Sequence, residues 1–379
     1  MKILVFAAAI ACAFILILPV SADGIELPEE YRDFSDAIPE DVASLLPDGF
    51  FSENFFELSE SVTEVSSPNY LLSLVWNLFC GGISGALSLF AILVGLLALT
   101  ALLNAFTEGL AAGNLKTALM YGTGLCTAAA VVGLQLPRII AASDFFGRVA
   151  ILMNSLIPVM GVLYISGGNT MGAALTSSSL LLQINLIELG ATALVIPSVC
   201  ACMALTLADS LRTGESTLSG ISASIKRTLS FVFGLCSTLL MASLSAQNVL
   251  SAASDSAGAR AVKFVAGNMI PVVGSTVGET LRTLATSVKL LRSTVGIAGI
   301  IAVALLLLPM LVELFLTRFV LNSAAAIGEL LGCRSAVKLY REIAALYGYI
   351  IASAAMASLL CIFSLTLFAV GSTAIGGLS

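Results

Sequence analysis

Apolar runs occupy most of this chain, and short polar segments separate them. Each run is close to the roughly 20 residues with which a helix crosses about 30 Å of hydrocarbon. A backbone in lipid must satisfy its hydrogen bonds internally, which favours helices. The pattern therefore predicts an all-α polytopic membrane protein with about 7–8 transmembrane helices. The approximate limits of the runs are 84–106, 117–137, 149–166, 172–188, 190–208, 229–248, 295–317 and 346–370.

The least certain part of this pattern is the pair of runs between residues 172 and 208. Three serines, Gln183 and Asn185 make its first half rather polar, and Glu188-Leu189-Gly190 is the one plausible break. Three interpretations stay open: a tight hairpin, a re-entrant element, or one long tilted helix.

The most unusual stretch, residues 260–292, lies between two apolar runs but is itself only half apolar. It begins with a Gly-Asn and an Ile-Pro pair, and proline disfavours helix at the residue before it. From Thr276 onward, apolar residues recur at helical spacing beside a basic face, and Glu279 completes a capping box. We therefore expect an interfacial or re-entrant helical element here. Its candidate structural or partner-contact residues are Lys263, Phe264, Gly267, Asn268, Pro271, Gly274, Arg282 and Lys289.

The chain begins with a pattern that predicts a signal peptide over residues 1–22. Lys2 precedes an apolar run, and Val20-Ser21-Ala22 supplies small residues at the cleavage positions. An uncleaved signal anchor is the alternative. In both cases the following residues lie outside the membrane.

Residues 23–70 form an acidic extracytoplasmic segment, which precedes a multi-span membrane domain over 71–379. The segment carries thirteen acids and one base. It is too small to bury a core of its own, so the pairs Phe50-Phe51 and Phe55-Phe56 need another apolar surface. The membrane surface, the chain's own membrane domain and a partner protein are the options. We favour the membrane domain, with short helices at 41–46 and 52–65.

The distribution of basic residues bears on topology. Eight spans put eight bases inside and seven outside, whereas seven spans put six inside and nine outside. The positive-inside rule favours eight spans, which places residues 260–292 on the outer side with the acidic segment. Residues 332–342 are basic and amphipathic, and predict a cytoplasmic surface helix that leads into the last span and touches anionic lipid or a partner.

Composition narrows the possible chemistry. Only 11% of residues are charged, against about 25% in soluble proteins. The absence of histidine removes the commonest metal ligand and general base. The eight cysteines form no CxxC pair and suit small buried positions. No nucleotide-binding or hydrolase motif occurs. We therefore assign no catalytic, cofactor-binding or metal-binding residues and expect no enzymatic activity.

Two acids lie within apolar runs, where charge usually marks function. Glu188 lies at the break described above, and Glu313 follows Pro309 in a strongly apolar run. Glu313 has two possible roles. It takes part in an ion or proton path, or it lies at the membrane interface near Arg318. We favour the interfacial position, because the run ends soon after it.

One part of the sequence resembles a known family. Lys263-Phe264-Val265-Ala266-Gly267-Asn268-Met269-Ile270-Pro271-Val272-Val273-Gly274, followed by Leu290-Leu291-Arg292-Ser293-Thr294-Val295-Gly296, resembles the stage III sporulation protein AE family of endospore-forming Firmicutes. The order of features is similar too, with Ile157-Pro158 and Ile196-Pro197 within the spans. The resemblance covers about residues 70–370.

The resemblance implies a role and no reaction. Proteins of that family belong to a mother-cell assembly in the membrane around the forespore, thought to form a channel with a secretion-type ATPase, ring-forming proteins and a forespore-side protein. It implies a non-enzymatic membrane subunit needed for endospore formation, with lipid and those subunits as partners and no nucleic acid. The alternatives are an autonomous secondary transporter or permease, with its site near Pro158, Glu188 and Pro197, and a membrane anchor without a pore.

Overall fold

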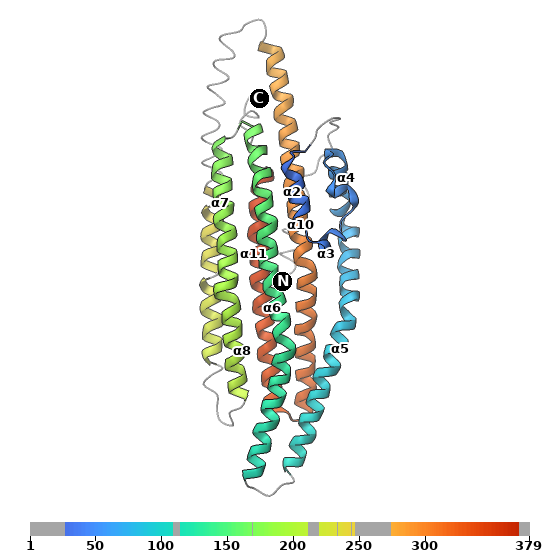
Figure 1. Cartoon of the computed structure of the whole chain (residues 1–379), viewed down its shortest axis with the longest axis vertical. Coiled ribbons are helices and arrows are strands. Elements are labelled where there is room, and N and C mark those ends of the chain that lie inside the picture. The colour runs from blue at the N-terminus through green and yellow to red at the C-terminus, as the bar shows by residue number, and fades with distance from the viewer. Residues whose placement is uncertain are drawn as a thin grey trace.

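The computed structural model describes residues 27–108, 114–168, 170–210, 220–232, 234–243, 245–246 and 274–370. The regular elements in these ranges are helices, which confirms the all-α fold class. The predicted signal peptide lies outside the described residues. Long helices lie side by side in an elongated bundle (Figure 1), in which α10 (Gly274–Leu330) packs most extensively against α11 (Arg334–Val370).

The helices are longer and fewer than the apolar runs suggest. Helix α5 spans Pro68–Glu108 and α6 spans Asn114–Ser166. At 1.5 Å per residue, the 53 residues of α6 extend for about 80 Å. By length and composition, six helices in the described residues qualify as membrane spans: Pro68–Thr107, Tyr121–Ser166, Gly172–Asp209, Gly220–Ser243, Thr286–Leu330 and Arg334–Val370.

The expected runs 117–137 and 149–166 are one helix, because the polar residues between them do not interrupt it. Pro137 lies inside α6, where proline removes a single backbone donor. Arg138 and Arg148 then find partners on other helices without leaving the helical path. A run of charges therefore need not mark a loop when neighbouring elements satisfy those charges.

The pair of runs from 172 to 208 is also continuous. Helix α7 (Thr170–Leu189) passes through a π-helical turn, η2 (Gly190–Val195), into α8 (Ile196–Ser210). Pro197 explains this turn, because a proline ring clashes with the carbonyl four residues before it and supplies no N–H. The helix widens here and does not reverse, so of the three interpretations the single long helix is right and the hairpin is wrong.

The acidic segment folds against the bundle as α2 (Glu30–Asp36), α3 (Glu40–Ala43), the 3-10 turn η1 (Asp48–Phe51) and α4 (Phe55–Val65). Tyr31, Phe34, Phe50 and Phe55 are buried in a core shared with α6 and α10. The Tyr31 hydroxyl donates a 2.9 Å hydrogen bond to the carbonyl of Phe50, and burial raises the pKa of that phenol. The expectation that these aromatic residues pack on the membrane domain is confirmed.

Within residues 260–292, the part that the structure describes is not a separate interfacial or re-entrant element. Residues 260–273 lie outside the described ranges. From Gly274, helix α10 runs through Arg292 into the apolar span without a break. No proline occurs between Pro271 and Pro309 to stop it. The amphipathic and apolar stretches are therefore two parts of one helix.

Candidate functional site

The most unusual buried contact in the bundle joins two polar side chains from distant parts of the chain. The Tyr347 hydroxyl on α11 donates a 2.7 Å hydrogen bond to Oε1 of Gln135 on α6. Both residues are 0% exposed. Buried polar groups normally have hydrogen-bond partners, but Gln135 Nε2 has none among the described atoms. An unused donor therefore remains at this site.

A second polar contact lies one helical turn along α6. Arg138 Nη1 donates a 3.1 Å hydrogen bond to Oγ1 of Thr317 on α10. Residues three apart on a helix share one side, so Gln135 and Arg138 face α11 and α10 from the same side of α6. Thr317 is fully buried, whereas Arg138 is half-buried.

Glu313 completes this group. It lies four residues before Thr317, and therefore on the same side of α10, but its side chain is exposed. Glu313 and Arg138 both act electrostatically on the Tyr347 hydroxyl, so both charges lie near it. We call Gln135, Arg138, Glu313, Thr317 and Tyr347 the polar layer.

The interfacial position expected for Glu313 stays a prediction, but Arg318, its expected partner, lies elsewhere. Helix α10 continues to Leu330, 17 residues beyond Glu313, which is about 25 Å along the axis. Arg318, the expected partner, lies against Gly348 of α11, where a Cβ atom would come within 2.9 Å of Arg318 Nη1. Among the described side chains, no ion pair joins Glu313 to Arg318. The apolar run ends near residue 317 because polar residues begin there, and the helix itself does not end.

We infer the position of the bilayer around the polar layer from two ion pairs. Arg148 on α6 pairs with Asp41 of α3 at 2.8 Å, and both side chains are about half exposed, which requires water. Lys338 on α11 pairs with Asp209 at 2.5 Å near the opposite end. Gln135 lies 13 residues before Arg148, or about 20 Å, and Tyr347 lies 9 residues after Lys338, or about 14 Å.

These two distances add up to about 34 Å, close to the roughly 30 Å thickness of the hydrocarbon. We therefore infer one membrane interface at the Arg148–Asp41 pair and the other at the Lys338–Asp209 pair, and this inference leaves the expected apolar run 149–166 beyond the first interface. The polar layer then lies near the middle of the bilayer, where ionisable side chains are rare and usually functional.

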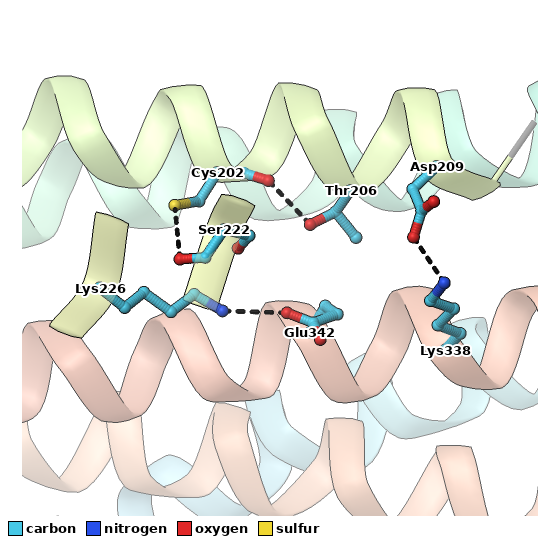
Figure 2. Close-up of polar contacts among 7 residues, drawn as sticks. All are labelled: Cys202, Thr206, Asp209, Ser222, Lys226, Lys338 and Glu342. Carbon is cyan, nitrogen blue, oxygen red and sulfur yellow. Dashed lines mark hydrogen bonds and ion pairs between the residues drawn. The ribbon is translucent and has the colours of Figure 1, made fainter. Parts of the chain in front are cut away.

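Figure 2 shows the charged end in detail. Asp209 at the end of α8 meets Lys338, and Lys226 of the helical segment Gly220–Ser243 meets Glu342 at 2.9 Å. The Cys202 thiol also approaches the Ser222 carbonyl at 3.9 Å. These contacts join three helices. Residues 334–342 form the first turns of α11 and lead directly into the last span, as expected. Lys338 faces buried Asp209, and contact of this part of α11 with lipid stays a prediction.

The structure separates the residues predicted for the site. Lys263, Phe264, Gly267, Asn268 and Pro271 lie outside the described residues. Gly274 begins α10, Arg282 lies on its early turns, and Lys289 is exposed there. Glu188 is exposed at the end of α7, just before η2, and takes part in no contact of the polar layer. Of the predicted residues, Glu313 is the one that the layer includes.

One buried cation, Arg292, was not predicted from the sequence. Arg292 on α10 is 1% exposed and lies over the rings of Tyr164 and Phe368, with its Cζ atom 4.1 and 5.2 Å from their centroids. Its Nη2 donates a 2.8 Å hydrogen bond to the Phe368 carbonyl. That carbonyl is in the last turn of α11, where carbonyls lack helical partners. Arg292 therefore caps the C-terminal end of α11. The one sequence signal for this buried position was that Arg292 is the last basic residue before an apolar run.

Comparisons with known proteins agree with the resemblance in the sequence. The family described as stage III sporulation protein AE matches residues 53–372. Stage III sporulation protein AE of Bacillus subtilis (strain 168) is 27% identical over 213 residues, which cover 56% of this chain and 53% of that protein. The chain thus aligns with about half the length of this relative. No solved structure matches the chain.

Proposed function

Because the chain belongs to the stage III sporulation protein AE family, we propose that it is a non-enzymatic membrane subunit of a mother-cell-to-forespore channel, a secretion-like complex needed for endospore formation. Family membership gives the role in sporulation. In this proposal the subunit lies in the mother-cell-derived outer forespore membrane. Its partners there are other subunits of the stage III complex, including a secretion-type ATPase and ring-forming proteins.

The observation that carries this proposal is the length of the helices beyond the expected outer interface. Helix α6 continues for 18 residues from Arg148 to Ser166, which is about 27 Å. Helix α10 also extends toward this end, and α2 packs on α6 while α4 packs on α10 (Figure 1). A protein that merely anchors a partner needs no such extension. A channel subunit that contacts proteins in the space between two membranes does.

The outer surface of this extension is suited to protein contacts. The acids of α2, α3 and α4 point almost entirely to solvent, while Arg32 is the one base among residues 27–67. Acidic surfaces of this kind select and orient partners with basic surfaces. In our proposal this segment and residues 260–292 contact the ring-forming subunits.

Deletion of the gene in the source organism tests the role. We expect forespores to be engulfed normally but to lose late gene expression, so that heat-resistant spores fall sharply, and a second copy of the gene should restore them. An affinity-tagged copy purified in mild detergent from sporulating cells should retain the ATPase and the ring-forming proteins. Normal spore counts after deletion would contradict the proposal.

An autonomous secondary transporter is the second candidate. The π-helical turn before Pro197 and the exposed Glu313 favour it, because interrupted helices and intramembrane acids occur in transport sites. Substitution of Glu188 and Glu313 by glutamine separates the two functions. A proton- or ion-coupled carrier in liposomes should lose transport without any partner present, whereas a channel subunit should show no transport by itself.

A further inference from the structure

The exposed position of Glu313 is difficult to reconcile with lipid. One turn further along the same side of α10, Thr317 is buried, and Val320 beyond it is buried too. Helices α5 and α6 diverge from the end where they are joined, and α10 lies between them (Figure 1). The carboxylate of Glu313 is therefore at a level of the bundle where its own chain does not cover it.

Helix α10 presents a different surface on its opposite side. Phe315 and Phe319 are 49% and 62% exposed, and lie about 3 and 9 Å further along the helix axis than Glu313. Exposed phenylalanine suits hydrocarbon. A charged side chain at the centre of the bilayer costs about 2.5–3.5 kcal/mol on insertion scales. The two sides of α10 therefore need different surroundings, which are lipid for the phenylalanines and a polar medium for the acid.

The groups next to Glu313 indicate that this medium is water. Gln135 Nε2 is buried without a hydrogen-bond partner among the described atoms, and a buried donor of this kind normally binds water or protein. Half-buried Arg138 and the hydroxyls of Thr317 and Tyr347 supply further polar groups. An apolar helix from a second copy of the chain would cover the Glu313 carboxylate without supplying a polar partner for it.

We propose that the side of α10 that carries Glu313 lines a water-filled path through the membrane domain of the assembled protein, with Glu313 and Arg138 as its charged wall. The path admits small hydrated ions and polar solutes, since both signs of charge face it. This inference rests on the proposed role as a channel subunit, and it names the surface of this chain that takes part in the channel.

Cysteine modification in membranes from sporulating cells tests this path. In a cysteine-free background, Glu313→Cys is compared with Phe319→Cys, which lies on the lipid side of α10 about 9 Å further along the axis. The probes are two membrane-impermeant methanethiosulfonates, the anionic sulfonatoethyl and the cationic trimethylammonioethyl reagent. Both react with the thiolate, which forms in water and not in hydrocarbon. We expect position 313 to react at least about tenfold faster than position 319.

The remaining charge gives a second measurement. In Glu313→Cys the Arg138 guanidinium stays, so the rate of the anionic reagent relative to the cationic one should be higher than the same ratio for a small free thiol, and this excess should fall when Arg138→Gln is added. If position 313 is unreactive in membranes but reactive after denaturation, the path does not exist. A disulfide between two copies at position 313 would show that a second chain covers this surface, and would also overturn the proposal.

Failure of the path and failure of the proposed function are distinguishable. Labelling reports whether water reaches position 313, and it does not depend on spore formation. Normal spores after deletion of the gene would contradict the channel role and leave the labelling result standing. Conversely, an unreactive position 313 in a strain that needs the gene would remove the path and retain the role.

Discussion

The Tyr347 hydroxyl donates a 2.7 Å hydrogen bond to Gln135 Oε1, and this bond joins α11 to α6 where neither side chain is exposed. Tyr347→Phe leaves the amide oxygen unpaired, which should lower the free energy of unfolding by about 1–3 kcal/mol. Thermal unfolding in detergent measures the change. Tyr349→Phe is the matched control, because the buried Tyr349 hydroxyl has no partner among the described atoms. Equal effects of the two substitutions would contradict the stabilising role of the bond.

Arg292 should be far more sensitive to substitution than nearby Lys289. Arg292→Met removes the ring contacts and the bond to the Phe368 carbonyl, which should cost on the order of 2–4 kcal/mol. Arg292→Lys should fall between methionine and the natural residue, since an ammonium can donate to the carbonyl but cannot stack as a planar group. Lys289→Met, one turn away and exposed, should be nearly neutral. Unfolding temperatures should be lowest for Arg292→Met, higher for Arg292→Lys and highest for Lys289→Met, and any other order would contradict the role of Arg292.

The contact between α10 and the end of α11 depends on a glycine. A Cβ atom on Gly296 would lie 2.7 Å from the Ala369 Cβ and 3.2 Å from its Cα. Gly296→Ala should therefore destabilise the protein by about 1–3 kcal/mol through overpacking. Gly133→Ala has open space around the new methyl group and should be neutral or raise helix stability by up to about 1 kcal/mol. Similar unfolding temperatures for both variants would refute the close packing at Gly296.

The two acids that pair with the first turns of α11 should differ in their effects. Asp209 is 4% exposed and pairs with Lys338, whereas Glu329 is 51% exposed and pairs with Arg341. Asp209→Ala should cost more, about 1–3 kcal/mol, because it leaves Lys338 without this acid. Glu329→Ala should cost about 0–1 kcal/mol and become negligible at high salt. The free energy of unfolding of both variants, measured at low and high salt, compares these costs. A larger effect of salt on the cost of Asp209→Ala than on that of Glu329→Ala would contradict this expectation.

The sequence was sufficient for the class of fold, because apolar runs of membrane length are typical of transmembrane helices. It was less informative about where helices end. The gap between the runs 117–137 and 149–166 and the break at Glu188–Gly190 suggested boundaries, but α6 continues through the first, and a π-helical turn joins α7 to α8 at the second. Local propensity cannot show that a partner on another helix satisfies Arg138 or Arg148. Those tertiary contacts allow one long helix where the composition suggested two.

Of the five residues of the polar layer, the sequence singled out only Glu313 as a candidate. Gln135, Thr317 and Tyr347 are ordinary polar residues in apolar runs, and they gain meaning because α6, α10 and α11 bring them together. Such contacts join residues that are about 180 to 210 positions apart. The interfacial place of Glu313 stays a prediction, but the helix does not end with the apolar run, because α10 continues to Leu330.

The bilayer position between the Arg148–Asp41 and Lys338–Asp209 pairs, with the acidic segment outside, underlies both the polar layer and the proposed path. Single cysteines at positions 48 and 329, both exposed in the structure, test it in intact cells with a membrane-impermeant maleimide. We predict that position 48 is labelled at once and position 329 only after the membrane is permeabilised. Labelling of both positions from the same side would contradict this placement.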